Sequence, residues 1–300
     1  MIPEQLRKEL VRQHYKIVGS HSAVKLCFWL KKSMRDEGFC YKQKFYGIQS
    51  HRCLQMTPWI LCPNRCLYCW RVIEKTKINV ERIDEPKEIV ENSIKAQRQL
   101  ISGFKGFAKV NIRKWREAQN PTNAAISLIG EPTIYPKLSS LIDEFHKSGF
   151  STFLVTNGQY PEALSKISEP TSLYVSLDAP DKETYRKVDR PSLPDFWERL
   201  ERSLEVMSSF SCRKVIRITL VKGFNSVYPQ KYARMIKKAN PDFVEVKGYV
   251  HVGESQKRLP RGAMPEHNYV RDFAMKIAEH SGYIYKDEQE ESRVVLLSGN

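Results

Sequence analysis

Short apolar runs rich in β-branched residues alternate along this chain with longer segments of helical period. The apolar runs predict strands at residues 54–61, 124–129, 152–156, 173–177, 215–221 and 243–247, with a late addition at 293–297. The segments between them predict helices at residues 86–102, 137–148, 161–167, 195–208, 229–239 and 266–281. Such alternation is typical of βα units around a parallel sheet. Six units predict an α/β fold, a partial (βα)6 TIM-like barrel.

The chain divides by pattern into residues 1–53, an N-terminal extension that we expect to pack beside the barrel, and a core of residues 54–300. It has no apolar run near the roughly 18 residues that span a bilayer. The charged N-terminal segment MIPEQLRKELVRQHY differs from a signal peptide. We therefore expect a cytoplasmic monomer that does not associate with membranes.

Polar or turn-forming segments follow all six predicted strands. They are CPNRCLYCW, GEPTIYP, NGQYP, DAPD, KGFN and GYVHVGESQKRLP. In barrels of this type the catalytic groups lie on the loops after the carboxyl ends of the strands. We therefore expect all six segments at one end of the barrel.

The charge balance is strongly basic, with 49 Lys and Arg against 34 Asp and Glu and a net charge of +15. This excess exceeds what solubility requires and favours a polyanionic partner such as nucleic acid. A generally basic proteome or the lysine-rich surface of a thermophile gives the same balance. The charge alone therefore does not decide the function.

The sharpest motif is C-x3-C-x2-C, formed by Cys62, Cys66 and Cys69, which we call the first cysteine set. A 4Fe–4S cluster takes four ligands, so three cysteines leave one iron open to a small molecule. Without a matching second pair, the spacing suits zinc poorly. It resembles the signature of radical S-adenosylmethionine (SAM) enzymes. In that family the open iron binds the amino and carboxylate groups of SAM, and an electron then breaks a carbon–sulfur bond to give a 5′-deoxyadenosyl radical.

The same resemblance gives cofactor-binding roles to six further residues: Tyr68, Gly130, Glu131, Asn157, Ser176 and Asp178. Tyr68 corresponds to an aromatic residue against the adenine, and Gly130 with Glu131 to the motif that holds the methionyl ammonium. The other three correspond to positions near the ribose and carboxylate. Without the resemblance, each of these segments is equally an ordinary turn or cap.

A second cysteine set, Cys27, Cys40 and Cys53, has equal spacings of 13 residues. The spacing is compatible with buried apolar cysteines, with a zinc site completed by His51, or with a second 4Fe–4S cluster that has one open iron. The seventh cysteine, Cys212, stands alone before an apolar strand, where a lone cysteine is more often part of the core.

Segments along nearly the whole chain resemble the tRNA wybutosine-synthesising radical SAM enzymes, the 4-demethylwyosine synthases, in their archaeal single-domain form. These segments are AVKLCFWLKK (23–32), CYKQKFYGIQSHRC (40–53), CPNRCLYCWR (62–71), ISLIGEPTIYP (126–136), YVSLDAP (174–180) and HVGESQKRLP (251–260). The N-terminal and C-terminal segments are not shared by radical SAM enzymes at large, so they carry the specificity of the resemblance.

The resemblance implies that the second cysteine set holds a second 4Fe–4S cluster, whose open iron binds pyruvate. It implies a carbon–carbon lyase reaction on tRNA-Phe. N1-methylguanosine beside the anticodon gains two carbons from pyruvate and becomes 4-demethylwyosine, with release of formate. Eukaryotic members carry a flavodoxin-like domain, which the 52 residues before Cys53 cannot form. An external electron donor of flavodoxin or ferredoxin type is therefore implied.

Lys42 lies two residues after Cys40, close in sequence to the iron expected to bind pyruvate. A desolvated lysine beside a cationic iron favours its neutral amine, which can attack the ketone of pyruvate to form a Schiff base. The resemblance also implies a catalytic role for the lysine of CYK. Pyruvate held by iron alone is the alternative, and Lys31 and Lys44 are nearby in the sequence.

Three basic residues after the sixth strand are predicted to contact the anticodon arm: Lys257, Arg258 and Arg261. A solvated surface run is the other interpretation of these charges. Competing functions for the whole chain are a radical SAM enzyme acting on a peptide or small metabolite, a zinc-dependent RNA-binding module without catalysis, and a radical enzyme whose second site is only structural.

Overall fold

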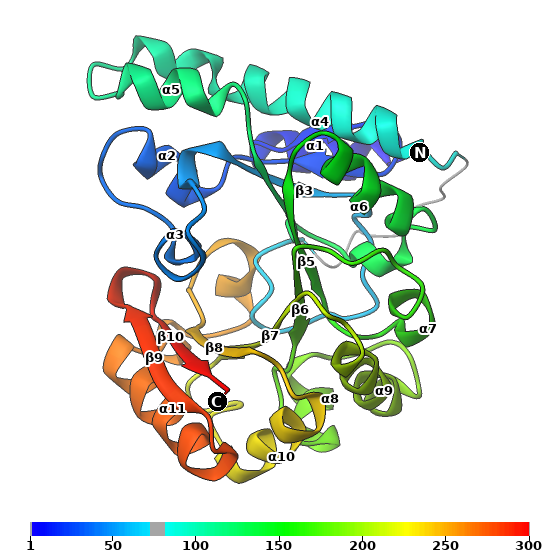
Figure 1. The fold of residues 1–300 in the computed structure, drawn as a ribbon, viewed down its shortest axis with the longest axis vertical. Coiled ribbons are helices and arrows are strands. Elements are labelled where there is room, and N and C mark those ends of the chain that lie inside the picture. Colours follow the sequence, from blue (N-terminus) through cyan, green and yellow to red (C-terminus); the bar gives the residue numbers. More distant parts are fainter. Residues whose placement is uncertain (1, 73–81, 300) are drawn as a thin grey trace. The chain divides into compact units, whose positions relative to one another are not determined.

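The computed structural model describes residues 2–72 and 82–299 (Figure 1). The described chain groups into two compact units. Unit 1 contains residues 2–61, 82–155 and 166–171, and unit 2 contains residues 62–72, 156–165 and 172–299. The predicted N-terminal extension falls in unit 1 beside the first parallel strands. Its boundary at residue 53 stays a prediction.

Unit 1 is built on three parallel strands, with two antiparallel strands at their edge. Its elements are α1 (Glu4–Arg12), β1 (Lys16–Val18), β2 (Ser22–Val24), α2 (Phe28–Ser33), α3 (Tyr41–Tyr46), β3 (Cys53–Thr57), α4 (Pro86–Ile101), α5 (Ile112–Ala118), β4 (Asn123–Ile126), α6 (Leu138–Lys147) and β5 (Ser151–Thr156). β3 pairs with β4 and β4 with β5 in parallel, whereas β2 pairs antiparallel with β1 and β3. α4 packs against β1, β2 and β3, and also against α6.

Unit 2 repeats this plan with three further parallel strands. Its elements are α7 (Pro161–Leu164), β6 (Ser172–Ser176), α8 (Lys182–Val188), α9 (Phe196–Ser208), β7 (Arg213–Leu220), α10 (Pro229–Ala239), β8 (Phe243–Gly248), α11 (His267–Ser281), β9 (Ile284–Gln289) and β10 (Val294–Ser298). β6, β7 and β8 pair in parallel, β10 pairs antiparallel with β8, and β9 pairs antiparallel with β10.

Short 3-10 helices complete both units: Ser50–Arg52, Ser102–Gly106, Pro132–Ile134, Gly253–Lys257, Arg261–Ala263 and Glu290–Ser292. Within the described residues, no helix is long and apolar enough to cross a membrane.

The core follows from the hydrophobic pattern of these elements. All four residues of β4 and the first four of β6 are buried, as expected of parallel strands covered on both faces. α10 buries a stripe at helical spacing that includes Tyr232, Ile236 and Ala239. The strands are thereby fixed, and the loops after their carboxyl ends are held in place.

The structure confirms a mostly parallel α/β fold, and the late predicted strand is the antiparallel β10. β3 ends at Thr57 rather than at residue 61, because Pro58 has no N–H to donate to a sheet. α7 ends at Leu164 rather than at residue 167. The pattern gave no signal for β1 and β2, whose three residues are too few to show a period. Closure into a partial barrel stays a prediction.

Candidate cofactor and active site

The first cysteine set lies on the cluster loop, residues 62–70, at the beginning of unit 2. The loop is tied to the end of α8, because Leu67 N donates to Val188 O at 2.8 Å and Arg65 N donates to Asp189 O at 3.0 Å. Burial raises the pKa of the Cys66 thiol, and the neighbouring Asp189, Cys69 and Cys62 raise it further. The three thiols are therefore close enough to act on one another electrostatically.

Two N–H donors point at sulfur atoms of this set. Asn157 Nδ2 lies 3.3 Å from Cys62 Sγ, and Arg71 Nε lies 3.0 Å from Cys69 Sγ. Burial lowers the pKa of Arg71, but the thiols of Cys62, Cys69 and Cys66 outweigh that effect and raise it above its ordinary value. Donors of this kind stabilise the negative charge of thiolate ligands. The residues present therefore fit an iron–sulfur cluster.

In the described part of the chain, the cysteine side chains are not arranged as a closed metal site. Among residues 2–72 and 82–299, the structure shows no group of three His, Cys, Asp or Glu side chains arranged as a metal site. The ligand assignment rests instead on the grouped thiols, the N–H donors and the motif.

A buried network surrounds Tyr68 on the same loop. Its hydroxyl lies 2.6 Å from Asp178 Oδ2 and 2.8 Å from Asp189 Oδ1. Cys66 Sγ donates to Asp189 Oδ1 at 3.4 Å, and Thr219 N donates to Asp178 Oδ1 at 2.5 Å. Burial raises the pKa of both carboxyl groups, and Asp178 raises that of Asp189 further. The structure thus brings Tyr68 and Asp178 together.

Ser176 ends β6 and is half-buried, two residues before Asp178. Ser176 therefore lies at the carboxyl end of its strand, where the sequence predicted it. Its contact with the cofactor stays a prediction, as do those of Tyr68, Asn157 and Asp178.

Gly130 and Glu131 belong to unit 1 and form the turn after β4. Gly130 has φ +72°, and a Cβ there would lie 1.9 Å from Trp59 O, so the turn requires glycine. Glu131 is buried, and its Oε1 accepts hydrogen bonds from Thr133 N at 3.1 Å and from Thr133 Oγ1 at 2.6 Å. In this structure its carboxylate caps the following 3-10 helix. Its role toward the methionyl ammonium stays a prediction.

The second cysteine set also groups within unit 1. Cys27 and Cys40 directly precede α2 and α3, and Cys53 begins β3. Burial raises the pKa of Cys53, Cys27 and Cys40 raise it further, and Lys42 opposes them. The three thiols and the Lys42 ammonium are therefore close neighbours.

Burial separates Lys42 from the other candidate lysines. Lys42 is only 8% exposed, and its Nζ lies 4.5 Å from the centroid of the Phe153 ring. Lys44 is exposed and Lys31 is half-buried. His51, the residue proposed to complete a zinc site, has Nε2 at 2.6 Å from Glu117 Oε2. This pairing directs the imidazole to a carboxylate.

The three predicted tRNA contacts differ in their surroundings. Lys257 Nζ lies 2.8 Å from Glu254 Oε2, and Arg261 is exposed. Arg258 is half-buried, and its guanidinium donates to Leu67 O at 3.2 Å through Nε and to Cys69 O through Nη2. The sequence analysis missed this contact and those of Arg71 and Asp189. Arg71 lies two residues after Cys69, and this closeness to the motif is the one signal that was available.

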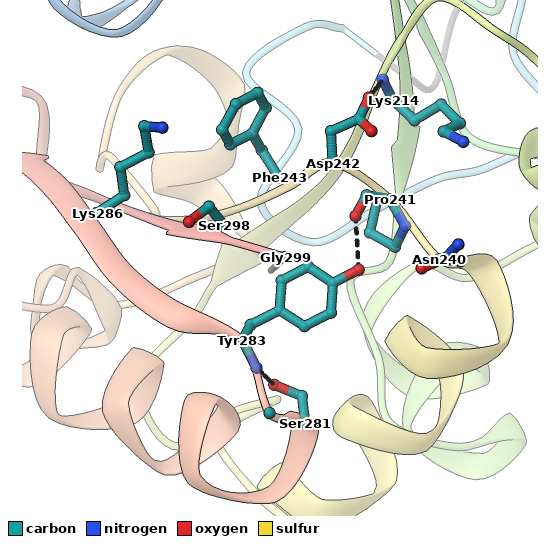
Figure 2. Close-up of a pocket in the computed structure, with 11 residues that line it drawn as sticks. Lys214, Asn240, Pro241, Asp242, Phe243, Ser281, Tyr283, Lys286, Ser298 and Gly299 are labelled. Atoms are coloured by element: carbon teal, nitrogen blue, oxygen red, sulfur yellow. Dashed lines mark hydrogen bonds between the residues drawn. The ribbon is translucent and has the colours of Figure 1, made fainter.

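A polar cavity of about 540 Å³ lies elsewhere in unit 2 (Figure 2). Its lining includes Lys214 at the start of β7, Asp242 and Phe243 at the start of β8, and Tyr283, whose hydroxyl donates to Pro241 O at 2.5 Å. The cavity is therefore at the amino ends of these strands. Because active sites of such folds lie at the carboxyl ends, it is not the candidate active site.

Residues 56–236 match the family model of the Radical SAM superfamily, and residues 238–299 match that of Wyosine base formation. The fold and the cluster loop thus define a radical SAM enzyme. An S-adenosyl-L-methionine-dependent tRNA 4-demethylwyosine synthase of Pyrococcus horikoshii is 52% identical over 99% of this chain and 89% of its own length. The chain therefore belongs to the family of S-adenosyl-L-methionine-dependent tRNA 4-demethylwyosine synthases.

Other relatives agree with this assignment. The Methanocaldococcus jannaschii protein of the same name is 43% identical over 99% of this chain and 96% of its own length. A solved structure of TYW1 with a lysine–pyruvate adduct bound superposes with a TM-score of 0.91 at 40% identity, covering 99% of this chain and 96% of that one.

Proposed function

We propose that this protein converts N1-methylguanosine beside the anticodon of tRNA-Phe, with pyruvate, into 4-demethylwyosine. The observation that carries the proposal is the buried Lys42 amine beside the second cysteine set. A peptide- or metabolite-modifying radical enzyme has no need of a ketone-capturing amine at that place. The TYW1 structure with a lysine–pyruvate adduct supports the same chemistry.

We assign a 4Fe–4S cluster and SAM to the first cysteine set, and a second 4Fe–4S cluster with pyruvate to the second set. When bound and reduced, the first cluster supplies the electron that cleaves SAM. The N–H donors of Asn157 and Arg71 stabilise the negative charge of the Cys62 and Cys69 thiolates. Within unit 2, Tyr68, Ser176 and Asp178 line the cofactor. Gly130 and Glu131, in unit 1, keep the role toward the methionyl ammonium that the resemblance implies.

Lys42 binds the ketone carbon of pyruvate, and loss of water leaves a Schiff base. We further propose an external electron donor of flavodoxin or ferredoxin type and a monomeric enzyme. A cytoplasmic location suits the chemistry, because a reducing compartment keeps thiolate ligands available.

The product assay tests the whole proposal. Anaerobically reconstituted protein, supplied with tRNA containing N1-methylguanosine, pyruvate, SAM and dithionite, is expected to give 4-demethylwyosine in the digested tRNA by mass spectrometry. Matched reactions lack pyruvate or contain tRNA without the methyl group, and neither should give the product. Formation of 5′-deoxyadenosine with no change in the methylated tRNA would reject the tRNA substrate and favour the peptide or metabolite alternative.

We also propose that Lys257 and Arg261 contact phosphates of the anticodon arm, where the target base must leave its stack to react. tRNA affinity is expected to fall steeply with salt, because each neutralised phosphate releases counterions. Changing both residues to Gln should lower the slope of log affinity against log salt by roughly 2. Binding titrations between low and moderate salt measure this slope. Exposed Arg234 on α10, changed to Gln, is the control. A salt-independent affinity of the parent protein would refute an electrostatic interface.

A further inference from the structure

One segment of the C-terminal region donates hydrogen bonds to backbone carbonyls of the cluster loop. The 3-10 helix Gly253–Lys257 and Arg258 follow β8 and lie in the part of the chain that matches Wyosine base formation. Glu254 N donates to Trp70 O at 3.1 Å, and Arg258 donates to the carbonyls of Leu67 and Cys69. Three carbonyls of the loop, on residues 67, 69 and 70, are therefore bound from this one segment.

The segment is itself fixed, so it can act as a rigid support. Tyr249 Oη donates to Ser255 Oγ at 2.9 Å, and Ser255 Oγ donates to Val252 O at 2.6 Å. Buried Tyr249 and Leu259 also belong to a hydrophobic cluster against which Leu67 and Tyr68 pack.

Close approach adds a steric requirement at Gly253. This residue has φ +58°, and a Cβ there would lie 2.5 Å from Trp70 O. A backbone oxygen cannot swing aside as a side chain can. The two backbones are thus held at a distance that only glycine permits.

We propose that Arg258 is a positioning residue for Cys69. Its planar guanidinium offers several N–H donors in a fixed geometry, so one side chain orients two carbonyls of the same turn. Arg71 restrains Cys69 at the sulfur, to which its Nε donates at 3.0 Å. With the backbone and the sulfur both held, the Cys69 side chain keeps the direction in which it serves as a ligand. The inference rests on the proposed function only in taking Cys69 as a cluster ligand.

The test measures the reactivity of Cys69 in metal-free protein, so it needs no cofactor and no tRNA. Arg258→Gln is pulsed with iodoacetamide, and each cysteine is quantified by peptide mapping. Alkylation of Cys69 is expected to accelerate about tenfold, because hydrogen bonds from a charged donor are lost. The second cysteine set, in unit 1, should react as in the parent.

Three variants give the comparison. Arg258→Lys keeps the charge but cannot orient both carbonyls, so it should only partly restore protection. Gly253→Ala disturbs the same loop by its Cβ and serves if Arg258→Gln does not fold. Arg234→Gln, the same chemical change on exposed α10, should leave Cys69 unchanged. Melting temperatures establish that each variant is folded.

A second readout concerns the cluster itself. In the parent protein, adding SAM is expected to change the electron paramagnetic resonance spectrum of the first cluster. In reconstituted Arg258→Gln this spectral change should differ from that of the parent, while the signal of a second cluster should be the same in both proteins. A Cys69 alkylation rate within about twofold of the parent in both Arg258→Gln and Gly253→Ala would overturn the proposal. If Cys69 is exposed as expected but the parent enzyme forms no 4-demethylwyosine, the proposed function fails and this inference stands.

Discussion

Changing Cys27, Cys40 and Cys53 together to Ala is expected to remove about half of the iron bound after anaerobic reconstitution, since each cluster holds four irons. SAM cleavage to 5′-deoxyadenosine should persist, because the first cysteine set is intact in unit 2. Formation of 4-demethylwyosine should be lost with the proposed pyruvate site. Iron and sulfide analysis, absorbance at about 400 nm and chromatography of 5′-deoxyadenosine measure the three effects.

The complementary variant, with Cys62, Cys66 and Cys69 changed to Ala, should lose the other half of the iron and all SAM cleavage. Cys212→Ala is the control for removal of a thiol as such, since Cys212 lies outside both sets before β7. If the variant with Cys27, Cys40 and Cys53 changed to Ala kept its full iron content, the hypothesis of a second cluster would be rejected. Zinc in place of iron in the second cysteine set of the parent protein would favour the alternative in which the second site is only structural.

The fold was predictable where the hydrophobic pattern is long or repeated. Parallel strands such as Ser172–Ser176 are short apolar runs between helices, and α10 begins at Pro229 and ends at Ala239, as its pattern predicts. The extension was not predictable in the same way. Its helices Phe28–Ser33 and Tyr41–Tyr46 have six residues each, too few for a period, and depend on tertiary packing.

The cysteine sets of the candidate site could be proposed from the sequence, but the contacts around them could not. Cysteine spacing is a local property, so the first set could be found from residues 62–69 alone. The support of Cys69 by Arg258 joins residues 189 positions apart, and Tyr68 meets Asp189 across 121 positions. No periodicity or local motif records such pairs, because they exist only once the chain has folded.

Choosing among the lysines shows the same limit. Lys31, Lys42 and Lys44 are near one another in the sequence, and composition does not distinguish them. The structure buries only Lys42 among the three. Lys42 is thus the one of the three that is held away from bulk water beside the second cysteine set, where the proposal needs a nucleophilic amine. Burial therefore supports the choice that the resemblance had implied.

Borohydride trapping with labelled pyruvate is expected to attach label to the peptide that contains Lys42. Reduction of the Schiff base gives a stable secondary amine, so peptide mapping by mass spectrometry identifies the residue. Lys42→Ala should abolish the label and lower 4-demethylwyosine formation by about a hundredfold or more, the usual scale for loss of a catalytic side chain. Exposed Lys44, changed to Ala, should retain both label and product.

Lys42→Arg separates the covalent role from the effect of charge. Arginine keeps the positive charge beside Cys53 but stays protonated, so it forms no imine with a ketone. If the amine is the nucleophile, Lys42→Arg should be as inactive as Lys42→Ala and should carry no label. If it makes 4-demethylwyosine at the parent rate, the lysine contributes only charge. Pyruvate is then held without a covalent bond to the protein, and the methyl-derived carbon adds to its free ketone.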